Sequence, residues 1–370
     1  MADLKNTTIN ANGFVELPVG STGERPGGAN GAIRFNNSYN PPVLEFWDGS
    51  NNIWRPVTGY SSATVGTGGQ SIFYKGGGIT HVFTTVGNHT FTPTFTGTVQ
   101  VLVVAGGGGG AASHGAGGGA GGVTFNSAFP VTAGTGYPVT VAAGGTTRPY
   151  GNFANNGGNS VFSSITTTGG GGGGYWNQTA GVESRNGGSG GGAGSSGDDG
   201  SRFRLSGGRG TQGQGFPGGS GVRFNRQGDN AHLSGGGGGA GGPGKHSSDN
   251  REDAITADGG AGAATNILGE VLYFGGGGGA GPHLSPGGAG NGGVGGGGGG
   301  GAHHGSPRSP GNFPLLYGRG GGQTLNTGQP GVSQTTGGNA GANTGGGGGG
   351  GNNGDTNHQG GGSGIVIVRY

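Results

Sequence analysis

The pattern of apolar and polar positions predicts β-strands in three parts of the chain. Between residues 79 and 165, and again near the N-terminus, short stretches rich in Val, Ile, Thr and Phe are separated by turn signals such as Gly-Asn and Asp-Gly. The expected strands are Ala32–Asn36, Val43–Trp47, Ile53–Val57, Thr80–Val86, Thr90–Phe95, Thr98–Ala105, Gly122–Phe125, Tyr137–Val141 and Ser160–Ile165. The last residues, Ile365–Tyr370, are typical of a buried strand. No stretch has helical periodicity, so the sequence predicts an all-β fold without significant α-helix.

Runs of glycine replace this pattern between about residues 166 and 363. Glycine makes up 111 of the 370 residues, about 30%, against roughly 7% in ordinary proteins. The runs are unbroken, which excludes collagen, and connectors rich in Asn, Ser, Pro, His and aromatic residues separate them. They are Gly169–Gly174, Gly235–Gly239, Gly275–Gly279, Gly295–Gly301 and Gly345–Gly351. A flexible linker array is the alternative, but the strand after the last run requires the chain to return to the body.

Ordering these runs requires backbone hydrogen bonds, because glycine has no side chain to pack. Ordering a glycine costs about 0.5–1 kcal/mol more than ordering an alanine in regular structure, whereas the net stability of a domain is roughly 5–15 kcal/mol. A left-handed extended helix of about three residues per turn directs its N–H and C=O groups outward, where neighbouring helices can pair with them. We therefore expect a bundle of glycine-rich polyproline-II-type helices. Pure-glycine runs should be surrounded, and the side chains of mixed runs should face solvent.

Composition divides the chain into three regions. Residues 1–60 form an aromatic-bearing β module, residues 61–78 are a Gly/Ser/Thr-rich linker, and residues 79–370 form the glycine-rich body. The first region is too small to be stable by itself, which predicts a partner chain or symmetric copies. In the body we expect a β-sandwich that frames the glycine bundle of about residues 166–363, closed by a strand at residues 364–370.

Charge and cysteine content exclude several functional classes. The 17 Lys and Arg against 15 Asp and Glu give a net charge of +2 without a basic cluster, which disfavours nucleic-acid binding. With no cysteine, disulfides and thiolate metal sites are absent. Residues Met1–Asn10 lack the features of a signal peptide, and the longest apolar stretch, Val101–Ala105, is far shorter than a membrane span. We expect export by another route, such as release within a particle on lysis.

Residues 14–58 resemble a short repeat module of bacteriophage tail-fibre proteins, in which an LP-GT…RP stretch leads to G-IRYN and then to E-YDG and W. The matching residues are Leu17-Pro18-Val19-Gly20, Arg25-Pro26, Gly31-Ala32-Ile33-Arg34-Phe35-Asn36, Glu45-Phe46-Trp47-Asp48-Gly49 and Trp54-Arg55-Pro56-Val57. The chain departs from the module with Phe35 and Trp47 in place of tyrosine and with Pro41-Pro42 in the turn. Phe35, Phe46, Trp47 and Trp54 are expected to form the core of this module or to dock it.

The body resembles the glycine-rich domain of phage fibres. The resemblance rests on His81-Val82-Phe83, Phe91-Thr92, Val99–Ala105 leading into Gly106–Gly110, and the closing Gly364-Ile365-Val366-Ile367-Val368-Arg369-Tyr370. It implies a β-sandwich whose strands frame glycine-rich segments. In related adhesins, loops between polyglycine helices bind the host receptor. Together the two resemblances imply a homotrimeric virion fibre protein.

The polar motifs do not indicate an enzyme, a cofactor site or a metal site. Repeated G-x-G-x-x-G patterns are expected by chance at this glycine content, and Gly244-Lys245-His246 lacks the P-loop spacing. The carboxylates Asp198-Asp199, Asp249, Glu252 and Asp253 lie in Gly/Ser-rich loops without the apolar surroundings that raise the pKa of a glycosidase acid. His303-His304 has no further ligand at a metal-binding spacing.

The connector aromatics are the candidate receptor contacts, because exposed aromatic side chains often anchor binding surfaces. The candidates are Tyr175, Trp176, Phe203, Phe216, Phe224, His283, His303, His304, Phe313, Leu315, Leu316 and Tyr317. Residues 175–176 and 303–317 are the best candidates for a receptor-binding tip. The alternative is that these side chains cap the bundle or pack between subunits.

Two functions remain. The first is a host receptor-binding tail fibre on the virion surface, anchored through its N-terminal region to another virion protein and binding a glycan or protein of the bacterial envelope. The second is a purely structural virion component, such as a head fibre or decoration protein. Neither function involves nucleic acid or membrane insertion.

Overall fold

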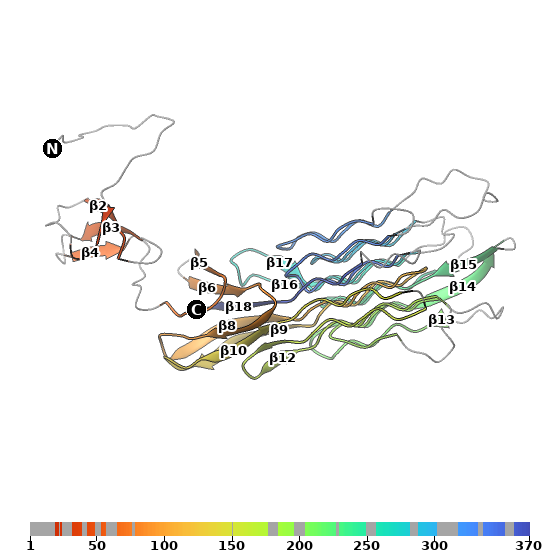
Figure 1. The fold of residues 1–370 in the computed structure, drawn as a ribbon, viewed down its shortest axis with the longest axis horizontal. Helices are drawn as coiled ribbons and strands as arrows, with labels where there is room; N and C mark the ends of the chain where they lie inside the picture. Colours follow the sequence, from red (N-terminus) through yellow and green to blue (C-terminus); the bar gives the residue numbers. More distant parts are fainter. Residues whose placement is uncertain are drawn as a thin grey trace, which may run out of the picture. The chain divides into compact units, whose positions relative to one another are not determined.

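A computed structural model describes residues 19–21, 23, 32–38, 43–48, 53–56, 65–75, 78–149, 151–176, 184–195, 204–226, 229–248, 257–281, 288–301, 317–331, 336–351 and 359–370. The chain divides into two compact units, Met1–Val65 and Gly66–Tyr370. The described residues contain many strands and no α-helix (Figure 1). The predicted all-β class is therefore confirmed.

The first unit is a four-stranded sheet in sequence order. Its strands are β1 (Val19–Gly20), β2 (Ile33–Asn36), β3 (Val43–Asp48) and β4 (Ile53–Pro56). The neighbours β2 and β3 are antiparallel, as are β3 and β4, whereas β1 runs parallel to β2. The three strands that the alternating pattern predicted are present.

The second unit contains a β-sandwich, whose strands Figure 1 shows beside the glycine-rich segments that continue from them. One sheet has the order β5-β6-β18-β8-β9 and the other β12-β11-β10-β7. The strands of the first are β5 (Ser71–Lys75), β6 (Gly78–Phe83), β8 (Gly97–Val104), β9 (Val123–Val131) and β18 (Ile365–Arg369). Those of the second are β7 (Gly87–Phe91), β10 (Tyr137–Val141), β11 (Ser160–Phe162) and β12 (Ile165–Thr167). The closing strand β18 thus occupies the centre of the larger sheet.

Both faces of the larger sheet are buried. One face packs against the smaller sheet, with Phe83, Val103 and Phe162 in the shared core. The other face packs through Leu102, Val104, Ile365 and Ile367 against Ile267 and Phe274. Burial on both sides explains why β18 is an almost uninterrupted apolar run, since a strand with one solvated face would alternate.

The predicted linker over residues 61–78 is wrong for residues 66–75. Strand β5 pairs with β6, and Thr67 forms a bridge with Thr92. Gly66 N donates to the Tyr370 hydroxyl at 2.7 Å, and His81 bonds the Gly68 carbonyl through Nδ1 at 2.7 Å and that hydroxyl through Nε2 at 3.1 Å. These bonds are mutually consistent when Nδ1 of a neutral His81 carries the proton. Burial lowers the pKa of His81 below its ordinary value, although the bond to Gly68 acts in the opposite direction.

The run Gly106–Gly110 shows how the glycine segments are ordered. Gly106 and Gly109 donate to residues 158 and 155, Gly107 and Gly110 to residues 362 and 359, and Gly108 to residue 119. Every third amide therefore reaches the same neighbouring segment, as a helix of about three residues per turn requires. The predicted polyproline-II-type bundle is confirmed, and it begins earlier than residue 166 because this run belongs to it.

Six segments surround this run. Three of them, at residues 154–158, 359–362 and 116–122, accept its amide protons. The other three, at residues 143–147, 345–351 and 169–174, lie where its side chains would be, because a Cβ built on each glycine would meet their backbone atoms at 1.9–2.5 Å. Such contacts are impossible for a real Cβ. The absence of side chains is therefore what allows the neighbouring backbones to pair.

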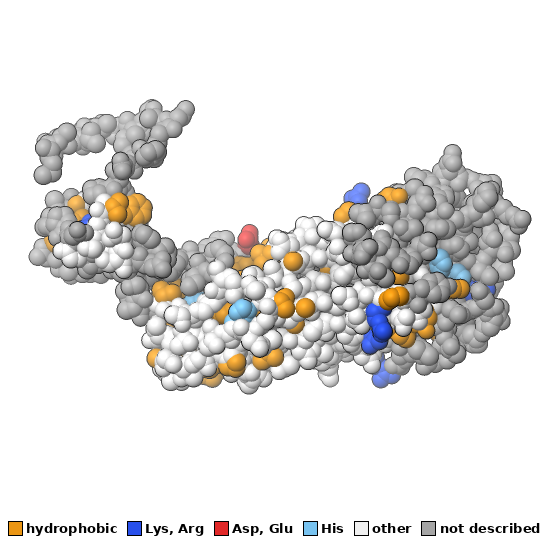
Figure 2. Space-filling view, in the orientation of Figure 1, with side chains coloured by type: hydrophobic (Ala, Val, Ile, Leu, Met, Phe, Trp, Pro, Cys, Tyr) orange, Lys and Arg blue, Asp and Glu red, His pale blue; other side chains and the backbone are white. Residues whose placement is uncertain are grey.

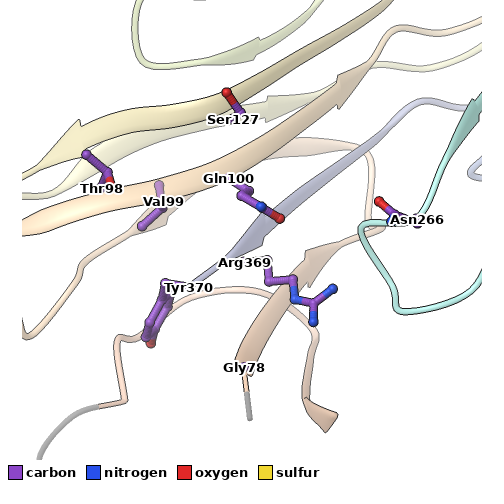
Figure 3. A pocket seen from close by; sticks show the side chains of 8 residues that line it. All are labelled: Gly78, Thr98, Val99, Gln100, Ser127, Asn266, Arg369 and Tyr370. Carbon is purple, nitrogen blue, oxygen red and sulfur yellow. The ribbon is translucent and has the colours of Figure 1, made fainter. Parts of the chain in front are cut away.

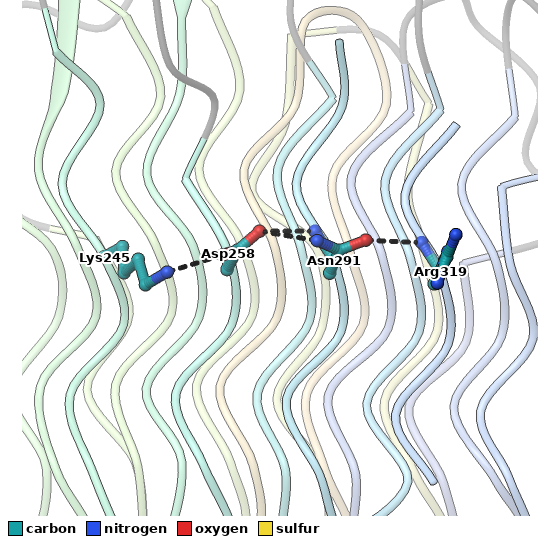
Figure 4. A network of polar contacts seen from close by, with 4 residues as sticks. All are labelled: Lys245, Asp258, Asn291 and Arg319. Carbon is teal, nitrogen blue, oxygen red and sulfur yellow. Dashed lines mark hydrogen bonds and ion pairs between the residues drawn. The ribbon is translucent and has the colours of Figure 1, made fainter. Parts of the chain in front are cut away.

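Segments at the bundle surface combine glycine with polar residues whose side chains bond neighbouring segments. Lys245 Nζ donates to Asp258 Oδ2 at 2.6 Å, Asp258 Oδ1 accepts from the Asn291 amide at 2.8 Å, and Asn291 Oδ1 accepts from the Arg319 amide at 2.9 Å (Figure 4). This row crosses four neighbouring segments. Side-chain oxygens thus satisfy outward-facing amides where no further helix lies alongside.

The region from residue 166 to residue 363 contains more regular β-structure than the sequence predicted. Strands β13 (Arg204–Leu205), β14 (Gly221–Arg226) and β15 (Asp229–Leu233) form a small sheet, and β16 (Ala263–Thr265) pairs with β17 (Leu272–Phe274). Figure 1 places the β13–β15 sheet at the end of the bundle away from the sandwich, here called the far end. The short β16–β17 hairpin supplies Phe274 to the second face of the larger sheet.

A candidate recognition surface at the far end of the bundle

The structure describes only some of the predicted receptor contacts. Phe203, His283, His303, His304, Phe313, Leu315 and Leu316 lie outside the described residues. Phe224 belongs to strand β14 rather than to a connector, and its side chain lies outside the description. Tyr317 is half-buried and precedes Gly318, whose amide bonds the carbonyl of Gly300.

Phe216 does not lie with the far-end aromatics. Its ring is 42% exposed. The nearby Gln214 accepts from the amide of Val123, the first residue of β9, and its side chain accepts from Thr168 just after β12. Phe216 therefore lies toward the sandwich, and its role as a receptor contact stays a prediction.

Tyr175 directly follows the buried glycine run Gly169–Gly174. Residues 171–174 are buried, whereas Tyr175 and Trp176 are half-buried. Tyr175 meets Phe153 edge-to-face with ring centroids 5.2 Å apart, and the guanidinium carbon of Arg185 lies 5.7 Å from the centroid of the Phe153 ring. An aromatic pair and a cation thus form one surface group.

Trp176 lies against two histidines. Its ring centroid is 5.9 Å from that of His114 and 5.3 Å from that of His232, and the two imidazoles stack at 5.4 Å with an interplanar angle of 9°. The His232 Nδ1 lies 2.8 Å from the buried Ser195 hydroxyl. The amide of Trp176 donates to the carbonyl of Ser113, which with His114 forms a left-handed turn at φ values of 60° and 53°. The far end is thus an ordered aromatic cluster.

Sequence reasoning missed four members of this surface, namely His114, Phe153, Arg185 and His232. His114, Phe153 and Arg185 each lie beside a glycine-rich stretch, as Tyr175 does, so a bulky residue at the start or end of such a stretch was the signal that could have found them. His232 lacked even this signal, because it is positioned by the β14–β15 hairpin.

In the sheet of the N-terminal unit, polar and charged side chains lie on the buried face and apolar side chains lie on the exposed face. Buried Arg34, Asn36 and Glu45 lie on one face, where the Asn36 side chain donates to Glu45 Oε1 at 3.0 Å. Trp54 is buried on this face too, and its ring centroid is 5.7 Å from that of Trp47. The expected core role therefore fits the two tryptophans.

The opposite face of this sheet is apolar and open. Val19 is 65% exposed, Ile33 45%, and Phe35 and Phe46 38% each. The register pairs Val19 with Phe35 and Ile33 with Phe46, so these side chains adjoin on one face. Phe35 and Phe46 were expected either to form the core of the module or to dock it, and their exposure fits docking.

A hollow of about 490 Å³ lies beside Arg369 and Tyr370 at the sandwich (Figure 3). Gln100, Ser127 and Asn266 also line it, so its wall is mainly polar. The Arg369 guanidinium is engaged, since Nη1 donates to the Ile267 carbonyl at 3.0 Å. We assign this arginine to the attachment of the 266–272 segment rather than to a ligand.

Charged side chains are sparse on the face of the body shown in Figure 2, and the lysines and arginines visible there lie toward the far end. Within the described ranges, no group of three or more His, Asp or Glu side chains is placed to hold a metal ion. No helix in that part of the chain is long and apolar enough to cross a membrane.

The fold and its surface define an all-β protein built on a hydrogen-bonded glycine bundle. The sequence model of the glycine-rich domain family matches residues 83–313, which is more than half of the chain. The chain belongs to this glycine-rich domain family. No curated protein matches it.

Proposed function

We propose that this protein is a bacteriophage fibre protein that binds a receptor on the host surface through the far end of its glycine bundle. The observation that carries the proposal is the clustering of Tyr175, Trp176 and their aromatic neighbours where surrounded glycine runs end. Backbone packing leaves few positions in the bundle where a side chain can project. Recognition is therefore concentrated at the segment ends, while the bundle supplies rigidity.

The proposal includes a homotrimer held through the N-terminal unit, which also attaches to another virion protein. The open face of Val19, Ile33, Phe35 and Phe46 supports self-association, because contiguous apolar patches of a few hundred Å² commonly mark interaction sites. We propose a location on the virion surface and no enzymatic activity.

A purely structural virion component is the second candidate, favoured by the extent of the backbone hydrogen bonding. Adsorption of particles to host cells separates the two candidates. Deletion of residues 302–317, and separately the double substitution Tyr175→Ala with Trp176→Ala, should each abolish adsorption while particles still assemble. Unchanged adsorption by both variants would favour the structural role. New reducing ends in host polysaccharide after incubation would instead reveal a depolymerase.

A further inference from the structure

We propose that Phe153, Tyr175 and Arg185 form a binding site for a saccharide that carries a carboxylate, such as a uronic acid residue. This inference rests on the proposed receptor-binding function and specifies the chemistry of its ligand. The site adjoins the Trp176–histidine cluster at the far end, because Tyr175 directly precedes Trp176 in the chain.

Three neighbouring segments build the site. Phe153 precedes residues 154–158, and Tyr175 follows residues 169–174; the two segments are joined by a bond from the Ala154 amide to the Gly173 carbonyl at 3.1 Å. Arg185 belongs to residues 184–195, which accept from Gly171 and Gly174 through the carbonyls of Ser189 and Gly192. The backbone bonds of buried glycines therefore fix the spacing of the three side chains before any ligand arrives.

The aromatic pair supplies an apolar platform. Phe153 and Tyr175 are both half-buried, and their edge-to-face geometry at 5.2 Å leaves ring surface exposed. The C–H faces of a sugar ring can lie on such a surface, while the Tyr175 hydroxyl, which forms no hydrogen bond within the described residues, can bond a sugar hydroxyl.

The Arg185 guanidinium makes the site selective for a negatively charged ligand. The Arg185 side chain makes no hydrogen bond or ion pair within the described part of the chain, and its only aromatic contact there is with Phe153. Its Nε is buried without a partner, so packing on Phe153 rather than polar contacts holds the guanidinium. In this half-buried side chain only Nε is buried without a partner, so the two Nη groups can donate hydrogen bonds to a ligand. A planar guanidinium that carries free donors matches a carboxylate.

The test uses the full-length protein and two probes of the same sugar. Hexagalacturonate carries carboxylates, and its methyl ester removes their charge. We expect isothermal titration to show binding of the acid at least tenfold tighter than binding of the ester, which corresponds to one charge-assisted hydrogen bond. In Arg185→Gln this preference should disappear while ester binding persists. Tyr175→Ala should weaken binding of both probes.

Arg319→Gln is the matched control, because it removes an exposed arginine from a segment that neighbours residues 288–301 instead. Its preference for the acid should remain, and the unfolding midpoints of all variants should match that of the wild type. Equal binding of both probes by the wild type, no binding of either, or an unchanged preference in Arg185→Gln would overturn the inference. Loss of host adsorption on deletion of residues 302–317, together with any of these results, would leave the proposed function standing.

Discussion

Replacement of Gly108 by alanine tests whether bare backbone is required in the bundle. A Cβ at this position would lie 2.2 Å from the Gly171 carbonyl oxygen and 2.9 Å from the Gly172 amide nitrogen. Ordinary contact needs about 3.4 Å or more. The segment of residues 169–174 would therefore have to move outward by roughly 1 Å, which a close-packed interior resists.

That movement would disturb hydrogen bonds on several segments. Gly119 donates to the Gly171 carbonyl at 2.8 Å, and Gly108 donates to Gly119 and accepts from Gly348 at 2.8 and 3.0 Å. Each buried backbone group left unpaired costs about 1–3 kcal/mol. Loss of two such bonds lowers the free energy of unfolding by about 2–6 kcal/mol, a large part of the roughly 5–15 kcal/mol available to a domain.

Denaturant unfolding of wild type and variant measures this loss. Gly322→Ala is the matched control, because a Cβ there meets nothing within 4 Å and its φ is not positive. The control should change the unfolding free energy by less than about 1 kcal/mol, and in the stabilising direction, since alanine reduces the entropy of the unfolded chain. A Gly108→Ala protein as stable as the Gly322→Ala protein would refute the reasoning.

Three further predictions concern the sandwich, the bundle surface and the N-terminal unit. Because burial depresses the pKa of His81, the folded state binds fewer protons than the unfolded state below pH 6.5. Unfolding free energy should fall as pH drops below that value, and less so in His81→Gln; equal pH dependence in calorimetry would contradict this. Asn156→Ala removes the acceptor of a neighbouring glycine amide at 3.0 Å, so that amide should exchange hydrogen faster by NMR, and unchanged exchange would oppose the assignment. Combined Phe35→Ser and Phe46→Ser should abolish self-association in sedimentation, whereas Phe125→Ser, which changes an exposed phenylalanine of the other unit, should not; retained self-association in the double variant would argue against the apolar face.

The sequence predicted the regular parts of the fold well, because strand pairing and glycine content leave strong local signals. The strands at residues 32–57 and 80–165 and the closing strand followed from apolar pattern alone. The linker prediction failed over residues 66–75 because the Gly/Ser/Thr-rich composition was given more weight than the apolar run Ile72–Tyr74. No local signal at residues 66–70 indicates the Gly66–Tyr370 and Gly68–His81 bonds, which join positions separated in the chain. The β14–β15 hairpin was missed because its polar strands differ little from a connector.

The candidate surface was only partly predictable. Tyr175 and Trp176 stood out because they follow a glycine run directly. Phe153, Arg185 and His232 did not, since their proximity to those residues arises from the lateral order of segments in the bundle. The lateral order of the segments cannot be predicted from one sequence, because every glycine run offers its neighbours the same donors and acceptors.

By itself, the sequence determined that the chain is all-β and that its glycine runs must be ordered through backbone bonds, since no side chains are present to do so. Tertiary structure alone decided which segments are neighbours and which glycines are indispensable. Buried Ala116 and Ala120 show that some bundle positions admit a Cβ, whereas Gly108 faces the Gly171 carbonyl and does not. The physical reason is that a helix of about three residues per turn presents successive residues to different neighbours, so the space at a position depends on a segment distant in the sequence.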